Sequence, residues 1–212
     1  MGIYLEALIL YVVLFFSGSI GLSTGGESGF SGITELARLL TYTIPSLALI
    51  WYLLLKVKKP VKWGVIPGKK DLIACLITFP CLLITGFVIA AISSNVSGSS
   101  AQISLHFPST TRGWILLCIS CIISAYLEES FFRFYLLSRR DEMRLSPAFA
   151  LAVSVALFSI CHIYEGPWGF LNSVIAGTLL GFIFLRYNSL HGVAVAHGLY
   201  NIAVYAIYAL FN

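Results

Sequence analysis

The segment from Trp114 to Leu137 reads WILLCISCIISAYLEESFFRFYLL, and it decides how the rest of the chain is interpreted. It is apolar and long enough to cross a bilayer, which takes about 20 residues, yet it contains Glu128, Glu129 and Arg133. A charged side chain at the centre of a membrane helix costs about 2.5–3.5 kcal/mol on the insertion scale. We therefore expect these three side chains to face a protein interior or a water-filled cavity, and they mark a candidate functional site.

The composition of the whole chain indicates a membrane protein. Of its 212 residues, 58% are hydrophobic and only 10% are charged, whereas soluble domains are about 25% charged. So much apolar surface cannot be buried inside a chain of this length. The formal net charge of +4 does not indicate nucleic-acid binding, because the basic residues flank apolar runs. We predict an all-α, polytopic membrane protein whose residues 1–212 form a single integral membrane domain.

The apolar runs that are long enough to span a bilayer predict about seven transmembrane helices with a polar catalytic cavity inside the bundle. These runs are Ile3–Leu22, Leu36–Leu55, Leu72–Ile92, Trp114–Leu137, Pro147–Tyr164, Trp168–Arg186 and Leu190–Phe211.

The basic residues predict the orientation of these spans. If all seven runs cross the membrane, ten lysines and arginines lie on one side of it, and only Arg38 and Arg112 lie on the other. Cytoplasmic loops carry the excess of Lys and Arg. We therefore expect a cytoplasmic N-terminus and a C-terminus outside. The ten are Lys56, Lys58, Lys59, Lys62, Lys69, Lys70, Arg139, Arg140, Arg144 and Arg186.

Two further patterns are most simply explained by packing. The five cysteines all lie in apolar stretches, where cysteine acts as a small hydrophobe; they are Cys75, Cys81, Cys118, Cys121 and Cys161. The glycines of Gly177–Gly181 form a GxxxG face on the sixth run. Such a face lets two membrane helices approach closely.

The charged residues of the central segment separate into a pair and a remainder. Glu129 and Arg133 are four residues apart, with the acid first, which is the favoured order for an ion pair on a helix. Glu128 is rotated by about 100° from Glu129 and cannot share that contact equally. Glu128 is therefore predicted to be the carboxylate left without a fixed counter-charge. A carboxylate of this kind suits a general base that works near neutral pH.

Two later spans supply further polar residues with helical spacing. Phe158 and His162 are four residues apart, and so are His197 and Asn201, so each pair shares one helix face. His197 and Asn201 together can donate hydrogen bonds to a developing oxyanion, while His162 can hold the other side of a water that contacts Glu128. Each of these residues alone fits helix–helix hydrogen bonding or packing; their joint presence favours a catalytic site.

The three motifs EExxxR (Glu128–Arg133), FxxxH (Phe158–His162) and HxxxN (His197–Asn201) occur in this order on separate spans. In this respect the chain resembles the CPBP family of CAAX proteases and bacteriocin-processing enzymes, also called the ABI family, which includes the type II CAAX prenyl proteases. The resemblance covers a motif-bearing core of about residues 114–212.

The resemblance implies an intramembrane endopeptidase that acts on a peptide or protein substrate. In that family the first glutamate and the first histidine of the motifs activate the attacking water. The corresponding residues here are Glu128 and His162. In the family, the second histidine and the asparagine stabilise the oxyanion. The corresponding residues here are His197 and Asn201. The positions of Glu129, Arg133 and Phe158 match supporting positions. Prenylated C-termini, leader peptides and signalling-peptide precursors fit the motifs equally well as substrates.

The motifs leave the role of a metal open. Glu128, His162 and His197 have the ligand types of a three-residue zinc site, but the chain lacks the HExxH motif of zincins. If Glu128 were a zinc ligand, it would serve less readily as a base, and no spare carboxylate remains once Glu129 pairs with Arg133. We therefore expect no cofactor, with zinc as the alternative.

Counting along the predicted spans places the candidate residues at different depths. At 1.5 Å per residue, His197 lies about 10 Å, Glu128 about 15 Å and His162 about 22 Å from the cytoplasmic end of its span. Since these depths must converge, we expect the fifth span to begin in the cytosol, where Ser146 and Pro147 form an N-cap and first-turn signal. The cavity is then expected in the cytoplasmic half or near the midplane.

Two other functions are compatible with these residues. A non-proteolytic protein, such as a bacteriocin immunity protein, would bind a peptide in the same cavity, although binding alone does not require an unpaired glutamate. A proton-coupled transporter would use acids and histidines as a relay, but the chain shows no inverted repeat and no paired broken helices.

Overall fold

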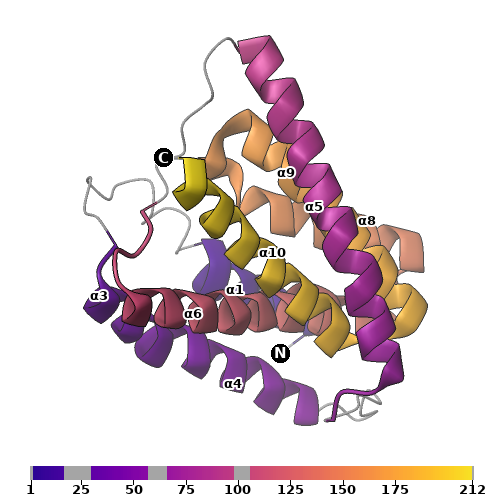
Figure 1. Cartoon of the computed structure of the whole chain (residues 1–212). Helices are drawn as coiled ribbons and strands as arrows, with labels where there is room; N and C mark the ends of the chain where they lie inside the picture. The colour runs from indigo at the N-terminus through magenta and orange to yellow at the C-terminus, as the bar shows by residue number, and fades with distance from the viewer. Residues whose placement is uncertain (1, 17–29, 57–65, 98–105, 212) are drawn as a thin grey trace.

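The computed structural model of the chain describes residues 2–16, 30–56, 66–97 and 106–211 (Figure 1). All regular secondary structure in these ranges is helical. The predicted all-α class is therefore confirmed for the part of the chain that the structure describes.

The helices follow one another with short π-helical turns (η1, η2, η3) and one 3₁₀ turn (η4) between them. In chain order they are α1 (Ile3–Tyr11), η1 (Val12–Phe16), α3 (Gly32–Arg38), η2 (Leu39–Thr43), α4 (Ile44–Leu55), α5 (Lys69–Ser97), α6 (Thr111–Glu129), η3 (Ser130–Tyr135), α7 (Leu136–Ser138), α8 (Pro147–Ile160), η4 (Ile163–Glu165), α9 (Gly166–Tyr187) and α10 (Leu190–Phe211).

Five continuous helical segments among the described residues are long and apolar enough to cross a membrane, which agrees with a multi-pass integral membrane protein. They are Gly32–Leu55, Lys69–Val96, Thr111–Ser138, Ile163–Tyr187 and Leu190–Phe211. The predicted count of seven is not confirmed, because Ile3–Phe16 and Pro147–Ile160 are shorter apolar helices. The end of the predicted first span, residues 17–22, lies outside the described residues.

The predicted fifth span, Pro147–Tyr164, is too long at its end. Its start is confirmed, because the hydroxyl of Ser146 caps α8 by accepting a hydrogen bond from the amide of Phe149. The helix then ends at Ile160, and the chain turns through η4 into α9. Gly166 adopts φ +79° at this turn, a conformation that suits glycine. The turn therefore places the residues after Ile160 between two helices instead of inside one.

The predicted orientation is not tested by the helices themselves. Three of the ten basic residues on which it rests, Lys58, Lys59 and Lys62, lie outside the described residues. The cytoplasmic N-terminus and the C-terminus outside stay predictions.

Helix α10 lies at the centre of the contacts that position the candidate site. It packs against both α5 and α6, while α9 packs against α5 and α8. Helices α3 and α4 pack against α6 from the other side, and Figure 1 shows α4 running alongside α6. The C-terminal end of α6 and the N-terminal part of α10 therefore meet inside the bundle.

The close approach of α9 to α8 uses the glycines of the predicted GxxxG face. A β-carbon at Gly181 would lie 2.3 Å from Cδ1 of Leu151, and one at Gly177 would lie 3.1 Å from Cδ1 of Phe158. A larger residue at either position would have to displace the side chain that it meets. The packing role of Gly177–Gly181 is confirmed, and the contact at Gly177 also fixes the ring of Phe158.

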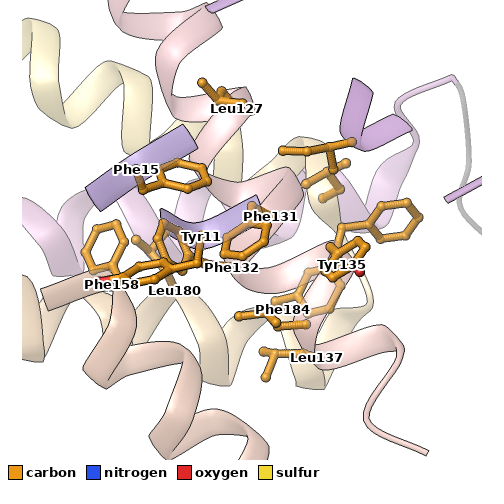
Figure 2. Packing of buried hydrophobic residues seen from close by; sticks show 14 of the residues in the cluster. Tyr11, Phe15, Leu127, Phe131, Phe132, Tyr135, Leu137, Phe158, Leu180 and Phe184 are labelled. Atoms are coloured by element: carbon orange, nitrogen blue, oxygen red, sulfur yellow. The ribbon is translucent and has the colours of Figure 1, made fainter. Parts of the chain in front are cut away.

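Aromatic side chains anchor η3 to the N-terminal helix (Figure 2). The ring of Phe15 lies 4.9 Å from that of Phe131 and 4.8 Å from that of Phe132, measured between centroids. The ring of Tyr11 is stacked with Phe131 and meets Phe132 edge-on, with 6.5 Å between centroids in both cases. Inside a bilayer, helix association depends on such van der Waals packing, because lipid tails are as apolar as the side chains. This cluster holds the turn that carries Arg133.

Candidate active site

The two glutamates of the first motif stand where α6 changes into the π-helical turn η3. Glu128 and Glu129 are the last residues of α6, and Arg133 lies within η3. A π-helical turn inside an α-helix is rare and occurs frequently at functional sites. Here it lies between the acidic pair and the rest of the helix.

Glu129 and Arg133 form the predicted ion pair. Oε2 of Glu129 lies 3.1 Å from Nε of Arg133, and both side chains are fully buried. Nη1 of Arg133 also donates to the hydroxyl of Ser154 on α8 at 3.3 Å. The guanidinium carbon lies 4.8 Å from the ring centroid of Phe158, close enough for a cation–π contact. The arginine therefore connects η3 to α8.

His197 lies between the two glutamates. Its Nδ1 lies 3.0 Å from Oε1 of Glu129, and its Nε2 lies 3.8 Å from Oε2 of Glu128. The ionised carboxylate of Glu129 can only accept, so the hydrogen of the shorter bond lies on Nδ1. Nε2 is therefore the ring nitrogen that faces Glu128. The sequence pattern had paired Glu129 with Arg133 alone and had missed its contact with His197.

Glu128 is the acid without a fixed partner. Its Oε2 is buried and has no hydrogen-bond partner within the described ranges. The side chain as a whole keeps 25% of its surface exposed, so it lies at the edge of the buried site. A buried carboxylate oxygen that lacks a hydrogen bond is uncommon in proteins and calls for an explanation. Its position agrees with the predicted separation of the two acids.

His162 lies just beyond the end of α8 and is oriented by that helix. Its Nδ1 lies 2.8 Å from the carbonyl oxygen of Phe158, which closes the last turn. A carbonyl only accepts, so Nδ1 carries the hydrogen, and Nε2 of the neutral ring is left as an acceptor. The ring of Phe158 lies 4.5 Å from that of His162 and 5.9 Å from that of His197, measured between centroids. Both imidazoles therefore pack on the same phenyl ring.

Asn201 lies one turn after His197 on α10. It is partly exposed, and its amide makes no side-chain hydrogen bond with the part of the chain that the structure describes. Its donors are therefore available to a bound molecule.

A third acid at this site was missed by the sequence pattern. Glu165 ends the turn η4 and lies within electrostatic range of Glu128, His162 and His197, next to Tyr164. The signal that could have found it is simple. It is an ionisable residue three positions after His162, directly after an otherwise apolar run.

The predicted zinc ligands are not arranged as a three-residue metal site. Within the described ranges, no group of three His, Cys, Asp or Glu side chains is placed so that it could hold one metal ion. Glu128 and His197 approach each other, with 3.8 Å between Oε2 and Nε2. The residues therefore do not fit a resident zinc ion in this arrangement.

A comparison with protein families identifies the segment that carries these residues. Residues 110–203 match the family described as type II CAAX prenyl endopeptidase Rce1-like. This segment is Rce1-like. The resemblance to CAAX proteases is thereby confirmed for nearly half of the chain. Searches of curated proteins and of solved structures found no match.

The Rce1-like segment contains every residue of the three motifs, namely Glu128, Glu129, Arg133, Phe158, His162, His197 and Asn201. The match supports a membrane protease that acts on a peptide or protein. The helices that precede the Rce1-like segment, from α1 to α5, contribute packing partners to it, such as Phe15 against η3.

Proposed function

We propose that the chain is an intramembrane endopeptidase in which Glu128 activates a water molecule for attack on a peptide bond. The observation that carries this proposal is that Oε2 of Glu128 is buried, makes no hydrogen bond among the described residues and lies 3.8 Å from Nε2 of His197. Glu129, in contrast, has a hydrogen bond to His197 and an ion pair with Arg133. A structural acid in a membrane would be paired, as Glu129 is, because an unsatisfied polar group costs several kcal/mol there. An acid kept free beside two imidazoles suits general base catalysis.

The proposed reaction begins with transfer of a proton from water to the carboxylate of Glu128. The water oxygen bonds to the carbonyl carbon of the scissile peptide, and the carbonyl oxygen becomes an oxyanion. When the carbon–nitrogen bond breaks, the leaving amine takes the proton that Glu128 received. The products are a peptide with a new carboxylate and a peptide with a new amine, and Glu128 is again ionised.

The proposed oxyanion donors are the imidazole of His197 and the amide of Asn201. When the ring is protonated, Nδ1 donates to Glu129 and the Nε2 hydrogen is available to the developing charge. The contact with Glu129 supports this role, because it holds the ring in one orientation. Asn201 shares the face of α10 with His197, and it is free to donate.

His162 is the proposed second contact of the attacking water. Its Nδ1 bond to the carbonyl of Phe158 supports this role, because it leaves Nε2 as an acceptor for a water hydrogen. We propose that the reaction needs no metal ion, since the three candidate ligands are not arranged around one point. Glu128 is then free to act as the base.

We propose that the substrate is a prenylated peptide C-terminus, in keeping with the family whose description the segment 110–203 matches. Leader peptides and signalling-peptide precursors are the other substrates that the motifs accommodate. The proposed orientation, with the N-terminus in the cytoplasm and the C-terminus outside, places the connection between α7 and α8 in the cytoplasm.

A comparison of the wild-type protein with two variants in cells tests the proposed function. Cells would express the wild-type protein, Glu128→Gln or Asp141→Asn, and the termini of membrane-associated peptides would be determined by mass spectrometry. Asp141 is the matched control, because its side chain is 87% exposed in the loop before α8. We expect wild-type-dependent termini to vanish with Glu128→Gln and to persist with Asp141→Asn. Termini that persist with Glu128→Gln would contradict the role of Glu128 as the base. If no termini depend on the wild-type protein, a protein that binds peptides without cleaving them is favoured.

A further inference from the structure

A second polar cluster lies where the end of α3 meets α6. Arg38 ends α3, and its Nη2 donates to the hydroxyl of Ser120 on α6 at 2.6 Å. Its Nη1 lies 3.4 Å from the hydroxyl of Ser124. Glu35 pairs with the same guanidinium, with 2.6 Å between Oε1 and Nη2. None of these residues takes part in the proposed hydrolysis.

The same face of α6 connects this cluster to the candidate catalytic base. Ser120, Ser124 and Glu128 follow one another at intervals of four residues on one α-helix, so they form one row. Two turns of helix separate Ser120 from Glu128, a rise of about 12 Å, and one turn of about 6 Å separates Ser124 from Glu128. The head group of Arg38 therefore lies one to two turns from Glu128 along this row.

Helix α10 presents a matching row. His197, Asn201 and Tyr205 are also spaced by four residues, and α10 packs directly on α6. His197 meets Glu128 at one end, and Tyr205 lies within electrostatic range of Arg38 at the other. The two helices therefore run in opposite directions, with one polar row facing the other. This arrangement forms a polar track from the catalytic base to the arginine.

The guanidinium of Arg38 has donors to spare. It carries five N–H groups, and Glu35 accepts from Nε at 3.2 Å and from Nη2. Ser120 takes the other hydrogen of Nη2. Among the described residues, Nη1 makes only the 3.4 Å contact with Ser124. The side chain keeps 43% of its surface exposed, so this edge can be reached by a ligand.

We propose that the Nη1 edge of Arg38, together with the hydroxyl of Ser124, binds the free C-terminal carboxylate of the peptide substrate. This inference rests on the proposed function, because it takes Glu128 and His197 as the place of the scissile bond. An extended peptide advances about 3.3 Å per residue. A carboxylate at Arg38 therefore lies two to four residues beyond the scissile bond. The protein then selects its cleavage site by its distance from the end of the substrate.

Glu35 orients the guanidinium for this role. Its two oxygens accept from Nε and Nη2, which turns the opposite edge, Nη1, toward Ser124 and the track. The forked guanidinium can hold one carboxylate on each edge, which a lysine ammonium does not reproduce. If Arg38 only held α3 against α6, its replacement would change affinity and kcat/KM equally for all substrates.

The test uses pairs of synthetic peptides with a prenylated cysteine followed by two, three or four residues. Each peptide is made with a free C-terminal carboxylate and with a C-terminal amide. Binding is measured by fluorescence anisotropy in vesicles containing Glu128→Gln, which retains the track but cannot hydrolyse the peptide. Cleavage is measured with the otherwise wild-type protein. Both measurements are repeated after Arg38→Gln, and after Arg38→Lys as the variant that keeps the charge.

We expect the free-acid peptides to bind about 10- to 100-fold more tightly than the amides, since one charge-assisted hydrogen-bonded pair discriminates by about this factor. Arg38→Gln should lower affinity and kcat/KM for the free acids to the level of the amides and leave the amides unchanged. Arg38→Lys should restore only part of the preference. A preference that appears also for an aspartate side chain in an amidated peptide would assign the site to carboxylates in general and overturn end recognition.

Two results separate this inference from the proposed function. If the free acid binds better than the amide only when Arg38 is present, but no peptide is cleaved, the carboxylate site stands and the proposed function fails. If peptides are cleaved by a Glu128-dependent reaction, but Arg38→Gln lowers acid and amide equally, the carboxylate site is overturned and the proposed function stands.

Discussion

Oε1 of Glu129 accepts a hydrogen bond from Nδ1 of His197 across 3.0 Å. The other oxygen of the same carboxylate lies 3.1 Å from Nε of Arg133. One buried side chain therefore connects α6, η3 and α10, and it fixes which nitrogen of His197 faces Glu128. Glu129 is accordingly a positioning residue, in addition to being the partner of a buried arginine.

Replacing Glu129 tests this positioning role. In Glu129→Gln the carboxylate charge is lost, so Arg133 becomes an unpaired buried cation and the orientation of His197 is no longer fixed. We expect a loss of stability of about 3–5 kcal/mol, as for broken buried ion pairs. We also expect kcat to fall by about 10²- to 10⁴-fold, as when a histidine loses its orienting carboxylate. Thermal unfolding in detergent and cleavage by the folded fraction would measure the two effects separately.

The control for this change is Asp141→Asn, which removes an exposed acid. It should leave both the unfolding temperature and kcat unchanged. A folded Glu129→Gln protein with the kcat of the wild type would contradict the positioning role, whatever its stability.

The sequence predicts part of this site and not the rest, for physical reasons. The spacing of Glu129 and Arg133 is a local helical property, so the ion pair could be predicted. The contact between Glu129 and His197 joins residues 68 positions apart, and no spacing rule reaches that far. Five of the seven apolar runs correspond to helices that are long and apolar enough to cross a membrane. The hydropathy of Pro147–Tyr164, however, continues past Ile160, where the turn into α9 ends the helix.

The depth mismatch between the predicted spans has the same origin. His162 was counted as lying inside a helix, whereas it follows the end of α8 and packs with His197 on the ring of Phe158. Glu165 and Arg38 were missed because each gains its significance from residues on other helices. Arg38, for example, was counted only as a charge on the side of the membrane opposite the ten basic residues, although it contacts Ser120 on α6.

Asn201 gives a test of the oxyanion site that leaves the fold nearly unchanged. Within the described ranges its amide makes no side-chain hydrogen bond, so Asn201→Ala removes a donor without leaving another group unpaired. We expect kcat to fall by about 10²- to 10³-fold with little change in KM, which is the usual loss for one oxyanion donor. Steady-state kinetics with one synthetic peptide would separate the two constants. A rise in KM with unchanged kcat would assign Asn201 to substrate binding instead.

Gly192 tests the close contact that places the start of α10. A β-carbon there would lie 2.6 Å from the backbone oxygen of Asp71 and 2.6 Å from the hydroxyl of Ser189. Because the backbone oxygen cannot move aside cheaply, we expect Gly192→Ala to destabilise the protein by about 1–3 kcal/mol. Gly32→Ala is the matched control, since its β-carbon would meet only Leu116 at 3.7 Å. Equal unfolding temperatures for the two variants would contradict the proximity of α5 and α10.

Metal removal tests the proposal that the reaction needs no zinc. The purified protein would be treated exhaustively with a chelator, and its zinc content would be determined by elemental analysis. We expect cleavage to be retained at substoichiometric zinc, since the three predicted ligands are not arranged around one point. Activity that is lost on chelation and regained with one equivalent of zinc would contradict this proposal and return Glu128 to the role of a ligand.

The most direct test of the central claim is the kcat of Glu128→Gln in reconstituted vesicles, measured with a prenylated peptide that the wild type cleaves. The glutamine keeps the size of the side chain but cannot accept a proton from water. We predict that kcat falls by about 10²- to 10⁴-fold, the contribution expected of a general base. The peptide affinity and the folding should be unchanged. A correctly folded Glu128→Gln protein that retains the wild-type kcat would contradict the account.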